Sequence, residues 1–251
     1  MKFILISFLP TKLYLLLRRV SFKINRKDSF NNLQNIRKVE THHGYSYKPF
    51  DEKMAIFVHI PKCAGISINK ALFGNLAGGH TTLDDYICIF RPEEFSNYFK
   101  FTFVRNPWDR LVSAYTFLKK GGLNKYDYNF YQEELSKYED FNDFVRRWLT
   151  PENIKKYHHF KPQLHYIVDR YNKVTVDYIG YFENLNEDFH YISNRMNVEF
   201  NLKKENSVNR ASYQEYYEPD TRRIVAEVYK NDIQALNYTF DSITEYKRKL
   251  W

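Results

Sequence analysis

The chain of 251 residues is poor in cysteine, glycine and proline. Its 2 cysteines, Cys63 and Cys88, form neither a disulfide framework nor the paired spacing of a zinc site. Such sparse use of cysteine is typical of a protein from a reducing compartment. With only 8 glycines and 8 prolines, the chain is neither fibrous nor dominated by loops. A folded domain with a hydrophobic core is expected instead.

A long apolar run is also missing. The apolar stretch at residues 3–17 is interrupted by Pro10, Thr11 and Lys12, and it is shorter than the roughly 20 residues that cross a bilayer. A basic segment follows it, without the small-residue cleavage site of a signal peptide. We expect residues 1–20 to lie on a membrane surface or to pack on the domain as a helix.

Acidic residues are the scarcer charged class. They number 30 against 38 basic residues, which gives a net charge of +8. A basic balance suits a polyanionic ligand: a nucleotide, an acidic glycan, a nucleic acid or a membrane surface. The strand signatures of RNA-binding domains are absent, so we predict no nucleic-acid partner. What the chain has in abundance is aromatic side chains, with 22 tyrosines and 21 phenylalanines to fill a core.

Strand and helix patterns alternate from Met54 onward. Short apolar runs at 54–60, 99–104 and 176–182 predict buried strands. The polar, patternless residues 21–53 are predicted to be a linker or irregular extension. Helices are predicted at 65–74, 92–99, 106–122, 140–151, 184–196 and 218–238. The fold class is therefore α/β: a single P-loop-NTPase-like domain over residues 54–251, with a mostly parallel central sheet flanked by helices on both faces.

The first predicted strand runs directly into the stretch HIPKCAGIS. A strand, a tight loop and a helix N-terminus together bind anions, because the first backbone amides are free and the helix dipole is positive there. Lys62 adds a mobile charge, Gly65 allows close approach to the backbone, and Ser67 offers a hydroxyl. The lysine precedes the glycine, so this is not the ATP-binding G-x-x-x-x-G-K-[ST] loop. No acidic residue is clearly placed for Mg²⁺, and we predict no metal requirement.

A second anion-binding segment follows the second predicted strand, in FTFVRNPWDRLVSAY. Arg105 comes at the end of this strand, and Ser113 lies two helical turns later. A guanidinium group can hold a phosphate through two hydrogen bonds, and a hydroxyl can donate a further one. Two such segments on neighbouring strands predict a ligand with two separated phosphates.

The combination of HIPKCAGISI and FVRNPWDRLVSAY resembles the sulfotransferases, in particular the carbohydrate (glycan) branch. Further similarity in HFKPQLHYI, in VDYIGYFENLNEDFHYI and in NRASYQEYYEPDTRRIVAEVYKNDIQALNYTF extends the resemblance over residues 54–240. The donor in that family is 3′-phosphoadenosine-5′-phosphosulfate (PAPS), which has one phosphate at each end of its ribose. The resemblance therefore implies metal-free transfer of a sulfuryl group from PAPS to a carbohydrate hydroxyl.

The resemblance also implies roles for individual residues. Lys62 would touch the bridging oxygen of the donor, Arg105 and Ser113 would hold its 3′-phosphate, and residues 209–213 would close over the nucleotide. Many relatives have threonine where this chain has Ile66, which puts one hydroxyl contact to the phosphate in doubt. The nucleotide-binding residues expected on this basis are Pro61, Lys62, Cys63, Ala64, Gly65, Ile66, Ser67, Ile68, Arg105, Ser113, Arg210, Ser212 and Tyr213.

Sulfuryl transfer by in-line displacement needs a base for the acceptor hydroxyl and a cation for the leaving phosphate. Lys62 is the expected cation. Histidine titrates near neutrality, so the candidate bases are His59, His80, His158, His159 and His165. Related glycan sulfotransferases place a catalytic histidine in the region of His80, which is therefore the first choice. His159 is the second choice, as the base or as an acceptor-binding group.

Two other functions are compatible with the sequence. A nucleotide or small-molecule kinase of related fold would require Mg²⁺ and ATP. A non-catalytic module that binds anionic glycans would need neither Lys62 nor a base.

The expected acceptor is a surface polysaccharide or glycolipid. We expect basic and aromatic residues around the site mouth to bind it: Lys119, Lys120, Arg146, Arg147, Lys155, Lys156, Lys161, Tyr126, Tyr128, Tyr131 and Tyr157. The expected compartment is the cytoplasm, at the inner face of the membrane, with the Golgi membrane as the alternative. The sequence specifies neither the acceptor hydroxyl nor the oligomeric state.

Overall fold

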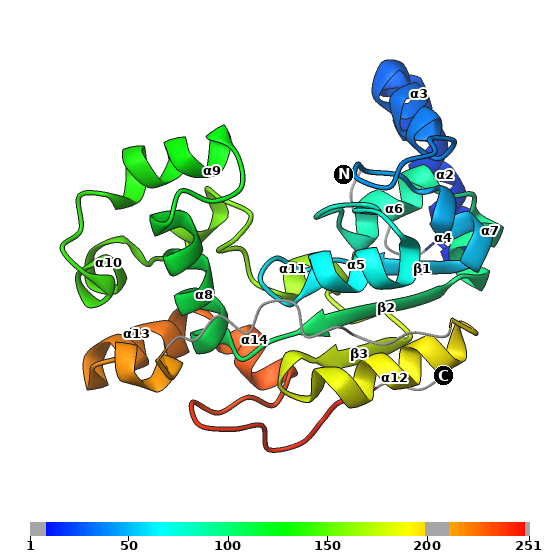
Figure 1. Cartoon of the computed structure of the whole chain (residues 1–251). Coiled ribbons are helices and arrows are strands. Elements are labelled where there is room, and N and C mark those ends of the chain that lie inside the picture. The colour runs from blue at the N-terminus through cyan, green and yellow to red at the C-terminus, as the bar shows by residue number, and fades with distance from the viewer. Residues whose placement is uncertain (1–8, 199–210, 249–251) are drawn as a thin grey trace.

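One parallel sheet organises the computed structural model, which describes residues 9–198 and 211–248 (Figure 1). Its strands in this part of the chain are β1 (Ala55–Val58), β2 (Phe99–Val104) and β3 (Tyr178–Tyr181), in the order β1-β2-β3. Both neighbouring pairs are parallel. The three strands predicted from apolar runs are confirmed, and their carboxyl ends meet at one edge of the sheet.

Helices make up most of the remaining described structure. They are α2 (Thr11–Asn25), α3 (Lys27–Ile36), α4 (Lys48–Lys53), α5 (Gly65–Phe73), α6 (Leu83–Ile89), α7 (Pro92–Asn97), α8 (Pro107–Lys119), α9 (Lys125–Phe130), α10 (Phe141–Trp148), α11 (Leu164–Ile167), α12 (Leu185–Arg195), α13 (Pro219–Val228) and α14 (Lys230–Ala235). The helix predicted over 218–238 is wrong in one respect, since it breaks at Tyr229. This buried tyrosine donates its hydroxyl hydrogen to Phe160 O over 2.6 Å.

Aromatic side chains cover one face of the sheet. Phe101 stacks on Phe57 from β1, with ring centroids 5.1 Å apart, and on Phe73 from α5. On β3, Tyr178 stacks on Tyr191 from α12 at 4.6 Å. Both helices therefore pack on the same face, in front of the sheet in Figure 1, while α11 lies behind it. The predicted parallel sheet with helices on both faces is confirmed.

Residues 21–53, predicted to be irregular, are largely helical, and that prediction is wrong. They contain the end of α2, all of α3 and all of α4. The polar residues that hid the pattern form solvated faces, while Phe30, Tyr47 and Phe50 are buried. Tyr47 and Phe50 belong to the same core cluster as the strands, so no domain boundary falls at residue 54.

Helix α2 packs against α6, with Leu15 buried and an Arg18–Asp84 ion pair of 2.8 Å. The expectation of a helix packed on the domain is confirmed for these residues. One stripe of the helix remains exposed: Leu13, Leu16, Leu17, Val20 and Ile24. Membrane contact through this stripe stays a prediction. Across residues 9–198 and 211–248, no helix combines the length and the apolar character needed to span a bilayer.

Candidate active site

The loop after β1 has a strained backbone. Lys62 and Ala64 have φ angles of 70° and 62°, in the left-handed region that costs a residue with a side chain roughly 1–2 kcal/mol. Strain of this kind is concentrated at functional turns. Helix α5 begins directly afterwards, at Gly65. Its first amides have no partner within the helix and lie at the edge where the strands end, as an anion site requires.

Gly65 is required by the ring of His59 rather than by its backbone angle. A Cβ at this position would lie 1.8 Å from Cδ2 and 2.0 Å from Nε2 of His59. The sequence predicted this glycine to admit a ligand, and the structure adds the packing reason. His59 is buried and stacks on Phe57, with ring centroids 5.7 Å apart. Burial first, and then the neighbouring histidines and Lys62, hold the pKa of His59 well below its usual value.

Cys63 points into the protein, although it was expected among the nucleotide-binding residues. Its Sγ lies 3.5 Å from Oε1 of Gln163 and 3.7 Å from Pro61 O. Burial raises the pKa of the thiol to about 12, so it stays protonated at neutral pH. Only the backbone of Cys63 therefore faces the site. Ser67 is half-buried in the first turn of α5, and Ile66 is exposed.

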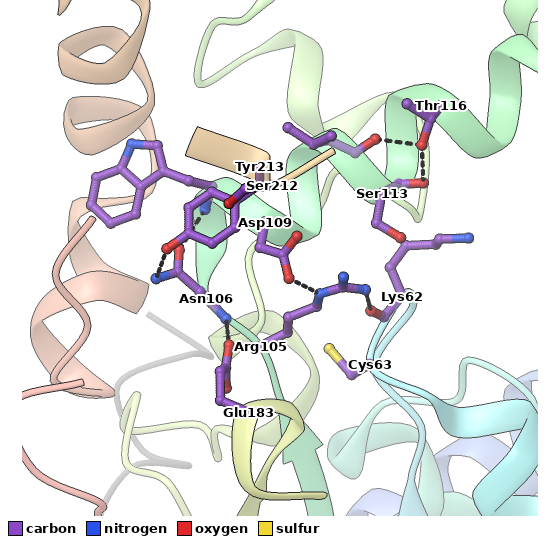
Figure 2. Close-up of polar contacts among 12 residues, drawn as sticks. Lys62, Cys63, Arg105, Asn106, Asp109, Ser113, Thr116, Glu183, Ser212 and Tyr213 are labelled. Atoms are coloured by element: carbon purple, nitrogen blue, oxygen red, sulfur yellow. Dashed lines mark hydrogen bonds and ion pairs between the residues drawn. The ribbon is translucent and has the colours of Figure 1, made fainter. Parts of the chain in front are cut away.

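Arg105 connects the two predicted anion-binding segments (Figure 2). Its NH1 nitrogen donates to Lys62 O over 3.0 Å, and its Nε donates to Asp109 over 2.7 Å. The guanidinium lies 3.9 Å from the ring centroid of Phe182. Burial lowers its pKa to about 10, so the group is still charged at pH 7. These two bonds use the Nε hydrogen and one NH1 hydrogen, which leaves the second NH1 hydrogen and both NH2 hydrogens as possible donors to a phosphate, so the two-bond contact stays a prediction.

The Lys62 side chain extends to α8. Its Nζ lies 3.6 Å from the centroid of the Phe117 ring, and Ser113 precedes Phe117 by one helical turn. The ammonium group and the Ser113 hydroxyl thus belong to the same face of α8. Figure 2 shows the Lys62 carbonyl at Arg105 and the Lys62 side chain passing Ser113, with its ammonium group pointing away from Arg105. The fold brings together Lys62, Arg105 and Ser113, as the sequence predicted.

The late segment reaches the same edge of the sheet. Asn106 donates from Nδ2 to the Tyr213 hydroxyl over 3.3 Å, and that hydroxyl donates to Phe240 O. Tyr213 therefore lies beside the site, with its hydroxyl already bonded to the protein. Ser212 is exposed and caps the short helix η4 (Tyr213–Tyr216). Arg210, the third residue predicted in this segment, lies outside the described residues.

Three histidines meet beside the Lys62 loop. His80, His158 and His159 each offer one ring nitrogen, and these nitrogens lie within 4.8 Å of one another. The pKa of each is lowered to about 4, by burial first and by nearby histidine and lysine charges second. All three rings are therefore neutral at pH 7. The first and second choices for the base, His80 and His159, both belong to this cluster.

The comparison with known families decides which family the chain belongs to. The family model described as "Sulfotransferase family" matches residues 47–239. The chain belongs to the sulfotransferase family. An uncharacterized protein of Archaeoglobus fulgidus is 38% identical over 96 residues, which cover 38% of this chain and 63% of the relative. The match thus spans less than two thirds of the relative's length. No solved structure matches the chain.

Family membership confirms the resemblance inferred from the two loop motifs. The carbohydrate branch, the donor and the reaction stay predictions. The match to the family model begins at residue 47, directly before α4 and before the domain boundary predicted at residue 54. Helices α2 and α3 lie outside the matched region.

Asp127 fixes the orientation of His159 in this sulfotransferase. Its Oδ1 lies 3.3 Å from Nε2 of His159 and accepts a hydrogen bond from the Tyr157 hydroxyl over 2.6 Å. Burial alone would raise the pKa of Asp127, but these hydrogen bonds and one from the Leu123 amide lower it well below its usual range. The carboxylate is therefore ionised and can only accept, which leaves the proton of His159 on Nε2.

Arg110 positions the segment that contains His159 through hydrogen bonds to its backbone. It is buried, donating from NH1 to His159 O over 3.2 Å and from NH2 to Lys161 O over 2.7 Å. Sequence reasoning missed Arg110 and Asp127 as positioning residues. Arg110 lies inside the quoted motif, five residues after Arg105, which is a signal that could have found it. Asp127 has no such signal, because its partners are distant in the sequence.

A cavity of about 570 Å³ opens on the other side of the histidines. His80 and His158 line it, whereas His159 is buried against the Phe117 ring, with centroids 5.0 Å apart. His80 is held in place by its Nδ1, which lies 3.3 Å from His59 O. A backbone carbonyl only accepts, so the Nδ1 atom is the protonated one and Nε2 has the lone pair. His80 combines an accessible position with the tautomer that a base needs.

Proposed function

We propose that this sulfotransferase transfers the sulfuryl group of PAPS to a hydroxyl of a carbohydrate. The hydrogen bond from Arg105 NH1 to Lys62 O is the observation that supports this most directly. It joins the two anion-binding segments at one edge of the sheet, within reach of a single small molecule. PAPS has a phosphate at each end of its ribose, so one donor could engage both segments.

The residues divide the chemical work between them. The acceptor oxygen forms a bond to sulfur as the sulfur–oxygen bond to the donor phosphate breaks. The bonding electron pair stays on that phosphate, which leaves as adenosine 3′,5′-bisphosphate. Lys62 stabilises the charge that develops there, and Nε2 of His80 takes the proton of the acceptor hydroxyl.

The cavity beside His80 is the proposed acceptor site. Its volume of about 570 Å³ is in the range of small-molecule sites, roughly 300–1,000 Å³. Its wall contains carboxylates and cationic side chains, which can form hydrogen bonds with the hydroxyl groups of a carbohydrate, and two tyrosine rings. The lining residues are Tyr14, His80, Thr82, Asp84, Asp85, His158, Lys161, His165, Tyr166, Val168, Asp169 and Arg170. Tyr14 lies outside the matched region, so the acceptor site would include an element that the family model does not cover.

The basic residues predicted around the acceptor are mostly elsewhere. Lys161 alone among them lines this cavity. Arg146 pairs with Asp220 over 2.7 Å, and Lys156 pairs with Glu134 over 3.1 Å. Arg146 and Lys156 thus form ion pairs on the protein surface. The proposed acceptor site contains charges of both signs rather than mainly basic residues.

Binding of adenosine 3′,5′-bisphosphate tests the proposal against its rivals. In the presence of a chelator and at 100 times its dissociation constant, the nucleotide should stabilise the protein by about 2.7 kcal/mol. For a chain of this size each kcal/mol of stabilisation raises the melting temperature by about 2–4 °C, so the nucleotide should raise it by roughly 5–11 °C. ATP with Mg²⁺ should produce no comparable rise.

Stabilisation by ATP with Mg²⁺ alone would favour the kinase. Stabilisation by an anionic glycan, with no effect of either nucleotide, would favour the binding module. If adenosine 3′,5′-bisphosphate stabilises the protein, radiolabelled PAPS and a panel of polysaccharides and glycolipids would test the acceptor class. Label transferred only to non-carbohydrate acceptors would reject that part of the proposal.

Arg105 provides a prediction about donor affinity. Removing its charge should weaken binding of adenosine 3′,5′-bisphosphate by about 2–4 kcal/mol, that is roughly 30- to 1,000-fold. Arg105→Ala alone would also remove the ion pair of the buried Asp109 carboxylate, so the informative variant is Arg105→Gln combined with Asp109→Asn. Calorimetric titration measures the change. Arg147→Gln, which alters an exposed ion pair with Asp143, is the control. Unchanged affinity in the double variant would reject the 3′-phosphate assignment.

A further inference from the structure

The three clustered histidines come from two separate parts of the chain. His80 lies in the loop before α6, whereas His158 and His159 precede α11. Each offers one ring nitrogen within 4.8 Å of the others. The neutral imidazole ring is the commonest protein ligand of transition metals, and three protein ligands with one open position are typical of reactive zinc sites. The cluster is therefore of a kind that could hold a metal ion.

His159 has a nitrogen that the described protein leaves unsatisfied. Its Nε2 faces Asp127, so its lone pair is on Nδ1. This Nδ1 is buried and has no hydrogen-bond partner among residues 9–198 and 211–248, in a side chain that is only 6% exposed. A buried polar atom without a hydrogen-bond partner destabilises the folded state. A ligand on Nδ1 would remove that destabilisation.

The hydrogen bonds of His80 and His159 have the pattern found around bound metals. One ring nitrogen of His159 donates to a carboxylate, and one of His80 faces a backbone carbonyl at 3.3 Å. Metal-bound histidines almost always use their second nitrogen in this way, because the bond fixes the tautomer and the ring orientation. His59, although close to His80, is packed against Gly65 and is unsuited to join them.

We propose that His80, His158 and His159 bind one divalent transition metal ion, with Zn²⁺ as the fitting occupant. Since His80 and His158 line the cavity, the fourth position of the ion would open towards it. The metal would take the lone pair of His80 that accepts the proton in the proposed reaction. Bound zinc would therefore inhibit transfer, a consequence that rests on the proposed function, whereas binding itself does not.

Metal titration of the full chain tests the site directly. Tag-free protein, stripped with a chelator and dialysed, is titrated calorimetrically with Zn²⁺, and with Co²⁺ to detect tetrahedral coordination by its absorption spectrum. We expect one ion per chain. His158→Gln and His80→Gln should each weaken binding more than the roughly 10- to 100-fold typical of losing an outer-shell partner. Asp127→Asn, which alters such a partner, should fall within that range.

His165→Gln is the matched control, because this histidine lines the same cavity without belonging to the cluster. It should leave zinc affinity unchanged. The ring of His158 is half-buried and makes no hydrogen bond with the residues that the structure describes, so the glutamine variant should fold even if a His159 variant does not. Circular dichroism checks this for every variant.

Absence of binding would overturn the proposal, and so would zinc binding that persists in both His158→Gln and His80→Gln. Adenosine 3′,5′-bisphosphate binding is measured on the same stripped samples. Nucleotide binding without zinc binding would reject the metal site and leave the proposed function intact, and the reverse result would do the opposite. Zinc that binds at the cluster without slowing transfer would overturn the inhibitory effect.

Discussion

Lys62→Ala is expected to lower kcat by about 100- to 1,000-fold, the loss typical of removing one preorganised group that stabilises developing charge. The leaving phosphate gains negative charge only as the sulfur–oxygen bond breaks. An ammonium group already in place stabilises that charge without any reorganisation of solvent. The nucleotide product should bind with much smaller loss, because the α5 amides, Arg105 and Ser113 are unchanged.

The structure gives a reason to expect that this variant folds. The bond from Arg105 is accepted by the backbone carbonyl of Lys62, which alanine retains. What disappears is the ammonium group over the Phe117 ring at 3.6 Å, an interaction worth about 0.5–2 kcal/mol. Single-turnover transfer from radiolabelled PAPS measures the chemical step, and a thermal melt measures the fold.

Lys70→Ala is the matched control, since this exposed lysine lies in the last turn of α5, away from the loop. Its rate should equal that of the unaltered protein. Lys62→Arg keeps the charge but changes its shape, and should retain more activity than alanine. A normal rate for Lys62→Ala would exclude this residue from the chemistry and with it the assigned role of the loop.

The strands and the two anion-binding loops could be predicted because their signals are local. A buried parallel strand is an unbroken apolar run, and the loop that follows it has its lysine, glycine and serine within six residues. The second apolar run in the same way led to Arg105 at its end and to Ser113 two helical turns later. What these signals could not give was orientation. Cys63 lies among the loop residues, yet its side chain points towards Gln163, a residue 100 positions away.

The helices of residues 21–53 and the positioning residues could not be predicted in the same way. Each depends on partners that lie far away in the sequence. The charge of Arg37, for instance, indicated a solvent-exposed residue. Its side chain is only 14% exposed, because it pairs with Asp51 and Glu94. The histidines were named as separate candidates, but only the fold shows that His80, His158 and His159 share one point. The three residues come from separate segments, so no rule based on spacing along the sequence could predict that they meet.

His80→Ala is expected to reduce transfer by about 100- to 10,000-fold, the usual contribution of a general base, while leaving adenosine 3′,5′-bisphosphate affinity within a few-fold of normal. His80 does not belong to either anion-binding segment, which is why the two effects should separate. His158 lines the same cavity and could accept protons in its place, so His80→Ala combined with His158→Gln sets the lower limit. If His159→Ala loses transfer and His80→Ala does not, the base is His159.

The pH dependence of the unaltered enzyme tests the same assignment without a mutation. Burial first, and then the charges of His158 and Lys62, lower the pKa of His80 to about 4, although the His59 carbonyl and the Asp127 carboxylate act in the opposite direction. A base must be neutral, so its activity is lost only as the pH falls through its own pKa. For the free enzyme, kcat/KM should therefore stay level from pH 8 down to about 5, rather than declining near 6.5.

Bound donor brings negative charge, which favours the protonated ring of His80 and raises its pKa. The acid limb of kcat should then lie at higher pH than that of kcat/KM, and His80→Ala should remove both. Coincident limbs near 6.5 would place the base on an exposed histidine outside the cluster.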